Sequence, residues 1–386
     1  MDEQTPDEPR DVGMDPRRVE RLVQHFRDAT ARGFVPGGQL AVRRAGRLVV
    51  DEAVGVLRGF RESEGVPRDP VAPDSEFLVF SAGKPVVGVA IAMLESRGVL
   101  DPSAPVSRYW PEFGAHGKDG ITVLDVLTHR AGVFTPALMT ASARWSDWDG
   151  ICEELATASP RYPRGTFAYM PYEFGWILGE VVRRVTGKDF GAFVRDEIAA
   201  PLGWEHFAFG VSSERARALA RPYWLGAGRT VVAGEDLSKS FEETNRREEA
   251  ATSVVPGGGL VTNARTLARF YAWVLDGCPM PSGQSAVHPE VLHAYTSREH
   301  FGFDRSNRVP LAVGRGFVVG TPWPSAYGAW GTSACFGHQG AFCSLGFADR
   351  DRDLAVAIVT NGNHGLMQTS RFLTTMLRHA RAAATG

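Results

Sequence analysis

The chain has 386 residues, of which 44% are hydrophobic and 22% are charged, and its formal net charge is −2. This composition is typical of an enzyme with a large core, and it offers no basic surface for nucleic acid or for an anionic membrane. No stretch of about 18 uninterrupted apolar residues occurs, so the sequence predicts no membrane-spanning helix.

The N-terminal residues 1–14 are rich in proline and acidic residues, which favours a disordered or loosely ordered segment. The segment lacks the basic and then apolar stretches of a secretory signal. Four cysteines, Cys152, Cys278, Cys335 and Cys343, form no C-x-x-C pair and have no zinc-like spacing to histidine. We therefore expect free thiols, no metal or other cofactor, and a cytoplasmic protein.

The first regular elements are a helix and two strands. Apolar residues recur at helical spacing between Asp15 and Gly33, which predicts a helix. Residues 37–55 predict two strands around a short turn. A strand-like apolar run over residues 75–83 then leads directly into a strongly apolar helix over residues 84–100.

The remaining elements suggest how the two ends of the chain combine. Helices and long loops alternate up to residue 250, whereas glycine-rich turns and strands return from residue 253. This pattern predicts an α+β fold. We expect an antiparallel sheet built from residues 15–80 and 251–386 and flanked by helices. A mainly helical domain of residues 81–250 is inserted, with the active site at the junction.

The segment Phe80-Ser81-Ala82-Gly83-Lys84 is the strongest functional signal. Residues i and i+3 share one helix face, so Ser81 and Lys84 are expected side by side. At a helix start, free N–H groups and the macrodipole favour a developing oxyanion. A serine hydroxyl needs a base, and a lysine can accept a proton only if burial lowers its pKa from about 10.4.

Ser-x-x-Lys alone is equally consistent with a helix N-cap followed by a surface lysine. Two observations favour catalysis. Residues 85–94 are almost entirely apolar, whereas a surface helix would show polar residues there. Lysine is also scarce in this chain, which has only Lys84, Lys118, Lys188 and Lys239. We therefore predict that Ser81 is the nucleophile and that Lys84 is its base.

Several segments, in the same order, resemble class C β-lactamases and, most closely, family VIII carboxylesterases. They are FSAGKPVVGVAIAMLESRGVL, ITVLDVLTHRAGV, PRGTFAYMPYEFGWILG, SVVPGGGLVTNA and FGHQGAFCSLGF. The resemblance covers roughly residues 15–382. It implies a β-lactamase/penicillin-binding-protein-like fold and a serine hydrolase that works through an acyl-enzyme on Ser81.

The resemblance also implies roles for further residues. Tyr169 matches the tyrosine that shares proton transfer with the lysine, and Tyr172 is the alternative; core packing is the other explanation for either side chain. The motif His338-Gln339-Gly340 stands where β-lactamases have Lys-Thr-Gly, and it is expected to bind substrate. The N–H of Ala341 would form an oxyanion hole with that of Ser81.

Two departures from the β-lactamase pattern point to the substrate. The Tyr-x-Asn motif reads Tyr169-Met170-Pro171, so an asparagine amide is missing. His338 replaces the Lys-Thr-Gly cation, which would bind a substrate carboxylate. Both departures favour an ester over a β-lactam or a D-amino-acid peptide. The resemblance suggests that His129 is structural.

The expected partner is a small-molecule ester or acyl donor, with no nucleic acid and no membrane; the oligomeric state is left open. An apolar pocket is expected to include some aromatic and methionine side chains. The candidates are Met170, Tyr172, Trp148 and Phe342, followed by Trp145, Tyr223, Trp224, Trp323 and Trp330. An acyltransferase that uses the same acyl-Ser81 is the main alternative. A β-lactamase, a D-amino-acid peptidase and a penicillin-sensor-like module are weaker ones.

Overall fold

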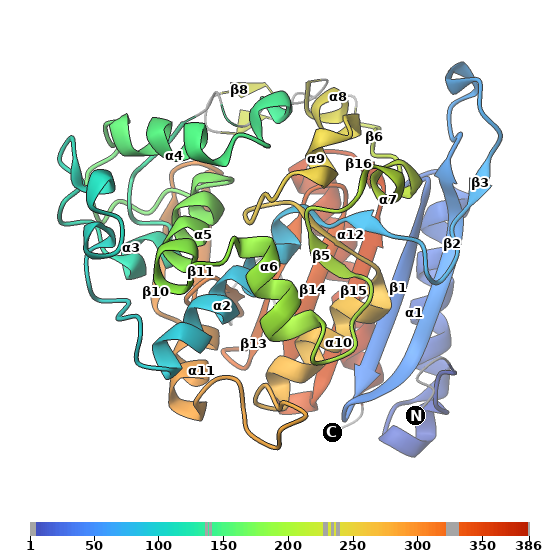
Figure 1. Cartoon of the computed structure of the whole chain (residues 1–386). Coiled ribbons are helices and arrows are strands. Elements are labelled where there is room, and N and C mark those ends of the chain that lie inside the picture. The colour runs from blue at the N-terminus through green and yellow to red at the C-terminus, as the bar shows by residue number, and fades with distance from the viewer. Residues whose placement is uncertain are drawn as a thin grey trace.

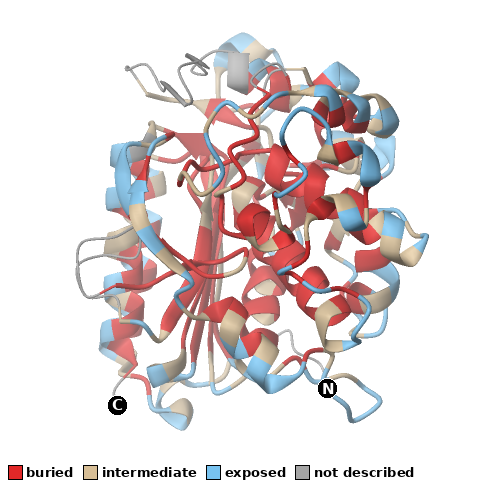
Figure 2. Cartoon of the chain, turned by 90° about the vertical axis from the view of Figure 1, so that its left-hand side faces the viewer, coloured by how far each residue is buried: buried red, intermediate tan, exposed pale blue. Residues whose placement is uncertain are grey.

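The computed structural model describes residues 5–135, 138, 141–226, 231–232, 235–236, 240–321 and 332–384. In this part of the chain, helices cover both faces of one large antiparallel sheet (Figure 1). Figure 2 shows that the buried residues gather on the sheet and on the helix surfaces turned towards it.

The large sheet has nine strands within the described residues, in the order β10-β11-β12-β13-β14-β15-β1-β2-β3. The strands are β1 (Gly37–Arg44), β2 (Arg47–Arg58), β3 (Asp69–Pro70), β10 (His300–Asp304), β11 (Val309–Val313), β12 (Val318–Val319), β13 (Cys335–Gly340), β14 (Ser344–Asp349) and β15 (Leu354–Thr360). Strand β1 pairs antiparallel with β15, from Gly38 opposite Thr360 to Arg44 opposite Leu354. The two ends of the chain therefore share one sheet, as the sequence predicts.

Along the central strands, successive side chains point to opposite faces of the sheet, and this explains why a layer of helices covers each face. Leu40 and Ile358 belong to the core under α1 (Pro16–Ala31) and α12 (Leu366–Ala383). Ala41 and Val359, their neighbours in sequence, belong to the core under α2 (Lys84–Ser96) and α10 (Ala264–Leu275). Successive residues of a strand point to opposite faces. A strand with apolar residues on both faces is therefore covered by helices on both sides.

The remaining elements lie mostly between β3 and β10 in the chain. The helices are α3 (Val123–Leu127), α4 (Trp148–Thr157), α5 (Glu173–Thr186), α6 (Phe190–Val194), α7 (Ser213–Ala218), α8 (Ser240–Arg246), α9 (Glu249–Thr252) and α11 (Pro289–Thr296). The short strands are β4 (Phe77–Leu78), β5 (Phe207–Phe209), β6 (Tyr223–Trp224), β7 (Val231–Val232), β8 (Glu235–Asp236), β9 (Leu260–Thr262) and β16 (Gly362–Asn363). Across the described residues, every helix is too short or too polar to cross a bilayer.

The N-terminal segment differs from the loose order expected over residues 1–14. From residue 5 it is described, and a 3-10 turn spans Pro9–Val12. The Asp7 N–H donates to the Leu48 carbonyl at 2.8 Å, and the Asp7 carboxylate pairs with Arg47 at 2.6 Å. These contacts hold the segment against β2, and composition alone does not reveal them.

All four cysteines are buried, free thiols, as expected. Burial raises the pKa of Cys343 to about 11, so its thiolate is scarce at neutral pH. Burial also raises the pKa of the Cys152 and Cys278 thiols. These residues therefore behave as small apolar side chains rather than as nucleophiles.

Lys118 is completely buried, and its contacts are structural. Its Nζ donates to the Ala156 carbonyl at 3.0 Å and also to the Ala158 carbonyl. Both carbonyls lie at the C-terminal end of α4, where a cation complements the helix dipole.

Lys118→Met is expected to lower the free energy of unfolding by about 2 kcal/mol, because two buried carbonyls lose their donor. Denaturant unfolding of the variant and the wild type measures this difference. An unchanged midpoint would show that these hydrogen bonds contribute nothing to stability.

Candidate active site

Ser81 lies in a 3-10 turn, Phe80–Gly83, between β4 and the start of α2. Phe80 has a φ of 51°, in the left-handed region that side chains other than glycine rarely adopt. The chain therefore bends sharply just before Ser81, whose side chain is half-buried. A Cβ at Gly83 would lie 2.7 Å from Leu260 Cβ, so the glycine allows β9 to pack closely behind this turn.

The structure brings Lys84 and Ser81 together, as their spacing predicts. Lys84 Nζ lies 3.0 Å from Ser81 Oγ and is completely buried. It also donates to the carbonyl oxygens of Pro171 and Gly257, each at 2.6 Å. Burial lowers the pKa of Lys84 to about 7, and the charge of Glu173 opposes this shift. The amine is therefore partly neutral near pH 7.

The three partners of Lys84 match the valences of a neutral amine. Two N–H groups fit the two carbonyls, and the remaining lone pair can accept the hydroxyl proton of Ser81. Pro171, which stands at the asparagine position of the Tyr-x-Asn motif, supplies one of these carbonyls from its main chain. Lys84 therefore has a well-defined orientation even though the asparagine amide is missing.

Tyr169 adjoins both residues. Its ring centre lies 5.1 Å from Lys84 Nζ, and its hydroxyl hydrogen-bonds to Ser81. Burial raises the pKa of Tyr169 above its usual range, so the side chain is a neutral phenol. Its N–H donates to Asp304 at 2.8 Å and its carbonyl accepts from Ser306 at 3.0 Å, which fixes its main chain.

His129 holds the tyrosine segment in place. Its Nδ1 accepts from the Met170 N–H at 3.2 Å, and its carbonyl accepts from the Ala168 N–H at 3.0 Å. Burial holds the pKa of His129 well below its usual range, so the ring is neutral. Its ring centre lies 4.6 Å from that of Tyr169. This geometry fits the structural role suggested by the resemblance.

Strand β13 borders the turn that carries Ser81. A Cβ at Gly340 would lie 2.2 Å from the Val79 carbonyl oxygen, so only glycine permits this approach. His338 is buried, with Nδ1 2.5 Å from the Gln339 carbonyl oxygen, which can only accept. Burial and the charge of Lys84 lower the pKa of His338 to about 3. His338 is therefore neutral and provides no cation for a carboxylate.

The Gln339 side chain does not lie where a substrate-binding residue is expected. Its Oε1 accepts from Ser370 Oγ at 3.3 Å, on α12. Alternate residues of a strand face opposite sides, so this side chain points towards the α1 and α12 layer rather than towards Ser81. The predicted substrate contact can therefore involve only the main chain of Gln339.

The turn after β13 packs against the residue before Ser81. The Phe342 ring centre is 5.0 Å from that of Phe80, the residue before Ser81. Phe342 has a φ of 54°, and its carbonyl accepts from Thr360 Oγ1 at 2.7 Å. Ala341 stands between Gly340 and Phe342 in this turn, and its N–H as part of an oxyanion hole stays a prediction.

The predicted pocket aromatics separate into two groups. Tyr172 is buried, and its ring centre lies 5.1 Å from that of Trp145. Trp148 instead donates its indole N–H to Glu180 Oε2 at 2.8 Å and packs against Gly179. Both of these contacts are with α5, so its place in the pocket stays a prediction.

Two later aromatic candidates, Tyr223 and Trp224, form hydrogen bonds with residues outside the predicted site. The Tyr223 hydroxyl donates to Glu64 at 2.8 Å, and the Trp224 indole donates to the Gly226 carbonyl at 3.0 Å. Trp323 and Trp330 lie outside the described residues.

The sequence analysis did not single out Glu173, although it is completely buried at the start of α5. Its Oε1 accepts from the Thr135 N–H at 2.8 Å and from Thr135 Oγ1 at 3.1 Å. Its Oε2 accepts from the Tyr172 N–H at 3.3 Å. An acidic residue within the otherwise apolar run EFGWILG is the signal that could have revealed it.

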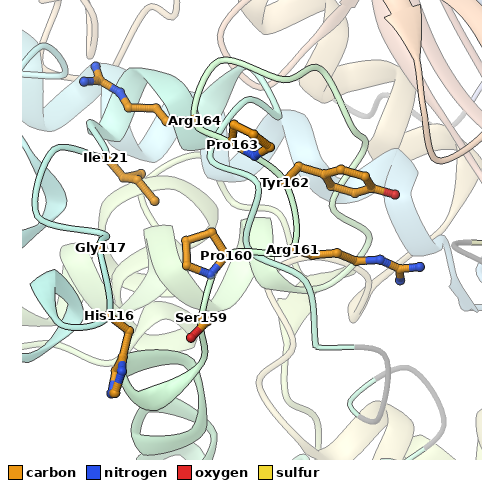
Figure 3. A pocket seen from close by; sticks show the side chains of 9 residues that line it. All are labelled: His116, Gly117, Ile121, Ser159, Pro160, Arg161, Tyr162, Pro163 and Arg164. Atoms are coloured by element: carbon orange, nitrogen blue, oxygen red, sulfur yellow. The ribbon is translucent and has the colours of Figure 1, made fainter.

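A surface hollow of about 430 Å³ lies elsewhere (Figure 3). Figure 3 shows the side chains of Arg161 and Arg164 pointing in opposite directions, so their charges do not converge. Arg164 is also paired with Asp125 at 2.7 Å. The hollow includes none of the predicted site residues.

Comparisons with known proteins identify the family of the chain. Residues 19–375 match the family model described as Beta-lactamase. Esterase/beta-lactamase LipL from Mycobacterium tuberculosis (strain ATCC 25618 / H37Rv) is 30% identical over 348 residues, which are 84% of this chain and 77% of that protein. Esterase EstB from Burkholderia gladioli is 27% identical over 376 residues, which are 88% of this chain and 90% of that protein.

A solved structure of a family VIII carboxylesterase aligns with a TM-score of 0.79 at 26% identity, covering 95% of this chain and 99% of that one. The predicted fold is therefore confirmed, and so is the resemblance to carboxylesterase-like serine hydrolases. The family model spans most of the sequence. The chain belongs to the beta-lactamase family.

Proposed function

We propose that the chain is a carboxylesterase that cleaves a small ester through an acyl-enzyme on Ser81. The observation that carries this proposal is the buried Lys84 amine, 3.0 Å from Ser81 Oγ and oriented by two carbonyls. The esterases among its relatives support an ester as substrate. The neutral His338 supports it too, because a substrate carboxylate would find no cation there.

Acylation begins when the Ser81 hydroxyl proton moves to the lone pair of Lys84 and Oγ attacks the ester carbonyl carbon. The N–H groups of Ser81 and Ala341 stabilise the oxyanion. When the bond to the leaving alcohol breaks, the alcohol oxygen takes the Tyr169 hydroxyl proton, and the Lys84 ammonium returns a proton to Tyr169. Lys84 and Tyr169 therefore end acylation in the protonation states in which they began it.

Deacylation reverses these roles. A water molecule gives its proton to Lys84 and attacks the acyl carbon, and the tetrahedral intermediate collapses with return of that proton to Ser81. An alcohol could replace the water, so acyl transfer shares this intermediate. We assign three buried side chains to the pocket: Met170 follows Tyr169 in the chain, Tyr172 follows Pro171, and the Phe342 ring packs against that of Phe80.

A fluorophosphonate probe tests the proposal. Intact-mass analysis should show one adduct, and peptide mapping should place it on Ser81 of a protein that turns over p-nitrophenyl acetate. Adding methanol then compares hydrolysis with acyl transfer. An adduct at another serine would overturn the proposal, and predominant methyl ester formation in dilute methanol would favour an acyltransferase.

The pH dependence of kcat/KM should show one acid limb near pH 7. Lys84 accepts a proton only when neutral, and burial lowers its pKa to about 7. Below that pH the ammonium has no lone pair, so kcat/KM should fall about tenfold per pH unit. His338, with a pKa of about 3, stays neutral throughout. Hydrolysis rates of p-nitrophenyl acetate between about pH 5 and about pH 8 measure this limb; a flat profile would contradict it.

Two wider predictions stay proposals. The division into a domain of residues 15–80 and 251–386 and a mainly helical domain of residues 81–250 is supported by the pairing of β1 with β15. The position of Ser81 at the start of α2 agrees with a site at the junction. A cytoplasmic location is the second of these proposals.

A further inference from the structure

Glu173 begins α5, the helix that packs against α2, which begins at Lys84, the base of the proposed reaction. It follows Pro171 by two residues, and the Pro171 carbonyl accepts from Lys84 Nζ at 2.6 Å. Glu173 and Lys84 are both completely buried, so little water screens the electrostatic interaction between their charges. We infer that Glu173 is a positioning residue that stabilises the Lys84 ammonium formed during acylation, an inference that rests on the proposed function.

The hydrogen bonds of Glu173 fit the ionised form. Three donors, the Thr135 N–H, Thr135 Oγ1 and the Tyr172 N–H, point at its two oxygens. An ionised carboxylate only accepts, whereas a protonated one would need an acceptor of its own. Burial raises the pKa of Glu173 above its usual value, and these donors oppose that shift without cancelling it. The carboxylate is thus fixed in place by partners that carry no charge.

The surroundings of Lys84 explain why this charge matters. The other titratable side chains that face it are neutral, because burial lowers the pKa of the histidines and raises that of the tyrosines. They are His129 before the tyrosine segment, His338 on β13, and Tyr169 and Tyr172 before α5. A buried ammonium without a countercharge is costly. Glu173 supplies that charge and raises the pKa of Lys84.

The role predicts an uncommon combination of effects. When the Ser81 proton moves to Lys84, the positive charge that appears is attracted by Glu173, so the transition state is stabilised. Removing the charge should therefore slow acylation. The same removal makes the ammonium less stable in the free enzyme, so Lys84 should lose its proton at lower pH. A purely structural residue would lower the rate without moving the acid limb.

The test compares pH profiles of kcat/KM for p-nitrophenyl acetate. Glu173→Gln should lower the plateau about tenfold and move the acid limb down by about one pH unit. Glu173→Asp keeps the charge, so the acid limb of its kcat/KM profile should stay at the wild-type pH even if its plateau kcat/KM is lower.

An unmoved limb in folded Glu173→Gln would overturn the inference. If that variant does not fold, Glu173→Met removes the charge with an apolar side chain of similar length and gives the same comparison. Ser81→Ala is measured in parallel. Activity in Ser81→Ala would overturn the proposed function itself, whereas an inactive Ser81→Ala with an unmoved limb overturns only the role of Glu173.

Discussion

Ser81→Ala is expected to abolish ester hydrolysis, lowering kcat/KM for p-nitrophenyl acetate by on the order of 10⁴-fold or more. Without Oγ no acyl-enzyme can form, and Lys84 could at best activate water directly. Because the Ser81 side chain is half-buried and small, the alanine should leave the fold and its thermal unfolding nearly unchanged.

Ser96→Ala provides the matched control at the other end of α2. Its Oγ accepts from the main-chain N–H of His288, at 3.0 Å. The same substitution at the far end of α2 should therefore retain full esterase activity. If Ser81→Ala kept its activity while Ser96→Ala lost it, the nucleophile would have to be sought elsewhere.

Much of the site could be predicted because it is local in sequence. Ser81 and Lys84 meet through the i to i+3 spacing of a helix start, and an apolar run after Lys84 implies its burial. Likewise, the hairpin of β1 and β2 follows from alternation around a short turn. Such features depend on neighbours within a few residues, so pattern alone predicts them.

The environment of Lys84 could not be predicted in this way. The carbonyls that orient its amine come from positions 87 and 173 residues further along the chain. The charge of Glu173 reaches Lys84 only because α5 packs against α2. These contacts are set by tertiary packing, and no spacing in the sequence encodes them.

Gln339 shows a second kind of error. The motif places three consecutive residues in the site, but a strand turns every second side chain away. His338 and Gly340 face the turn of Ser81, whereas Gln339 reaches Ser370 on α12. The motif therefore indicates where the main chain of the site runs. The alternation of side chains along the strand decides which of them can contact the substrate.

Lys84→Met is expected to lower kcat by on the order of 10³-fold or more and to remove the acid limb near pH 7. Methionine fills a similar buried volume but has no lone pair for the Ser81 proton. The Pro171 and Gly257 carbonyls lose their donor, which costs stability, while the cost of burying an amine disappears. Activity assays and denaturant unfolding of one preparation measure both effects.

Lys118→Met is the matched control, because both lysines are completely buried and both donate to two main-chain carbonyls. They differ in one respect: only Lys84 has a serine hydroxyl 3.0 Å from its Nζ. Lys118→Met should therefore lose stability and keep its rate at temperatures where it is folded. If both variants lost activity only in proportion to their unfolding, Lys84 would be a structural lysine and the base for Ser81 would have to be another group.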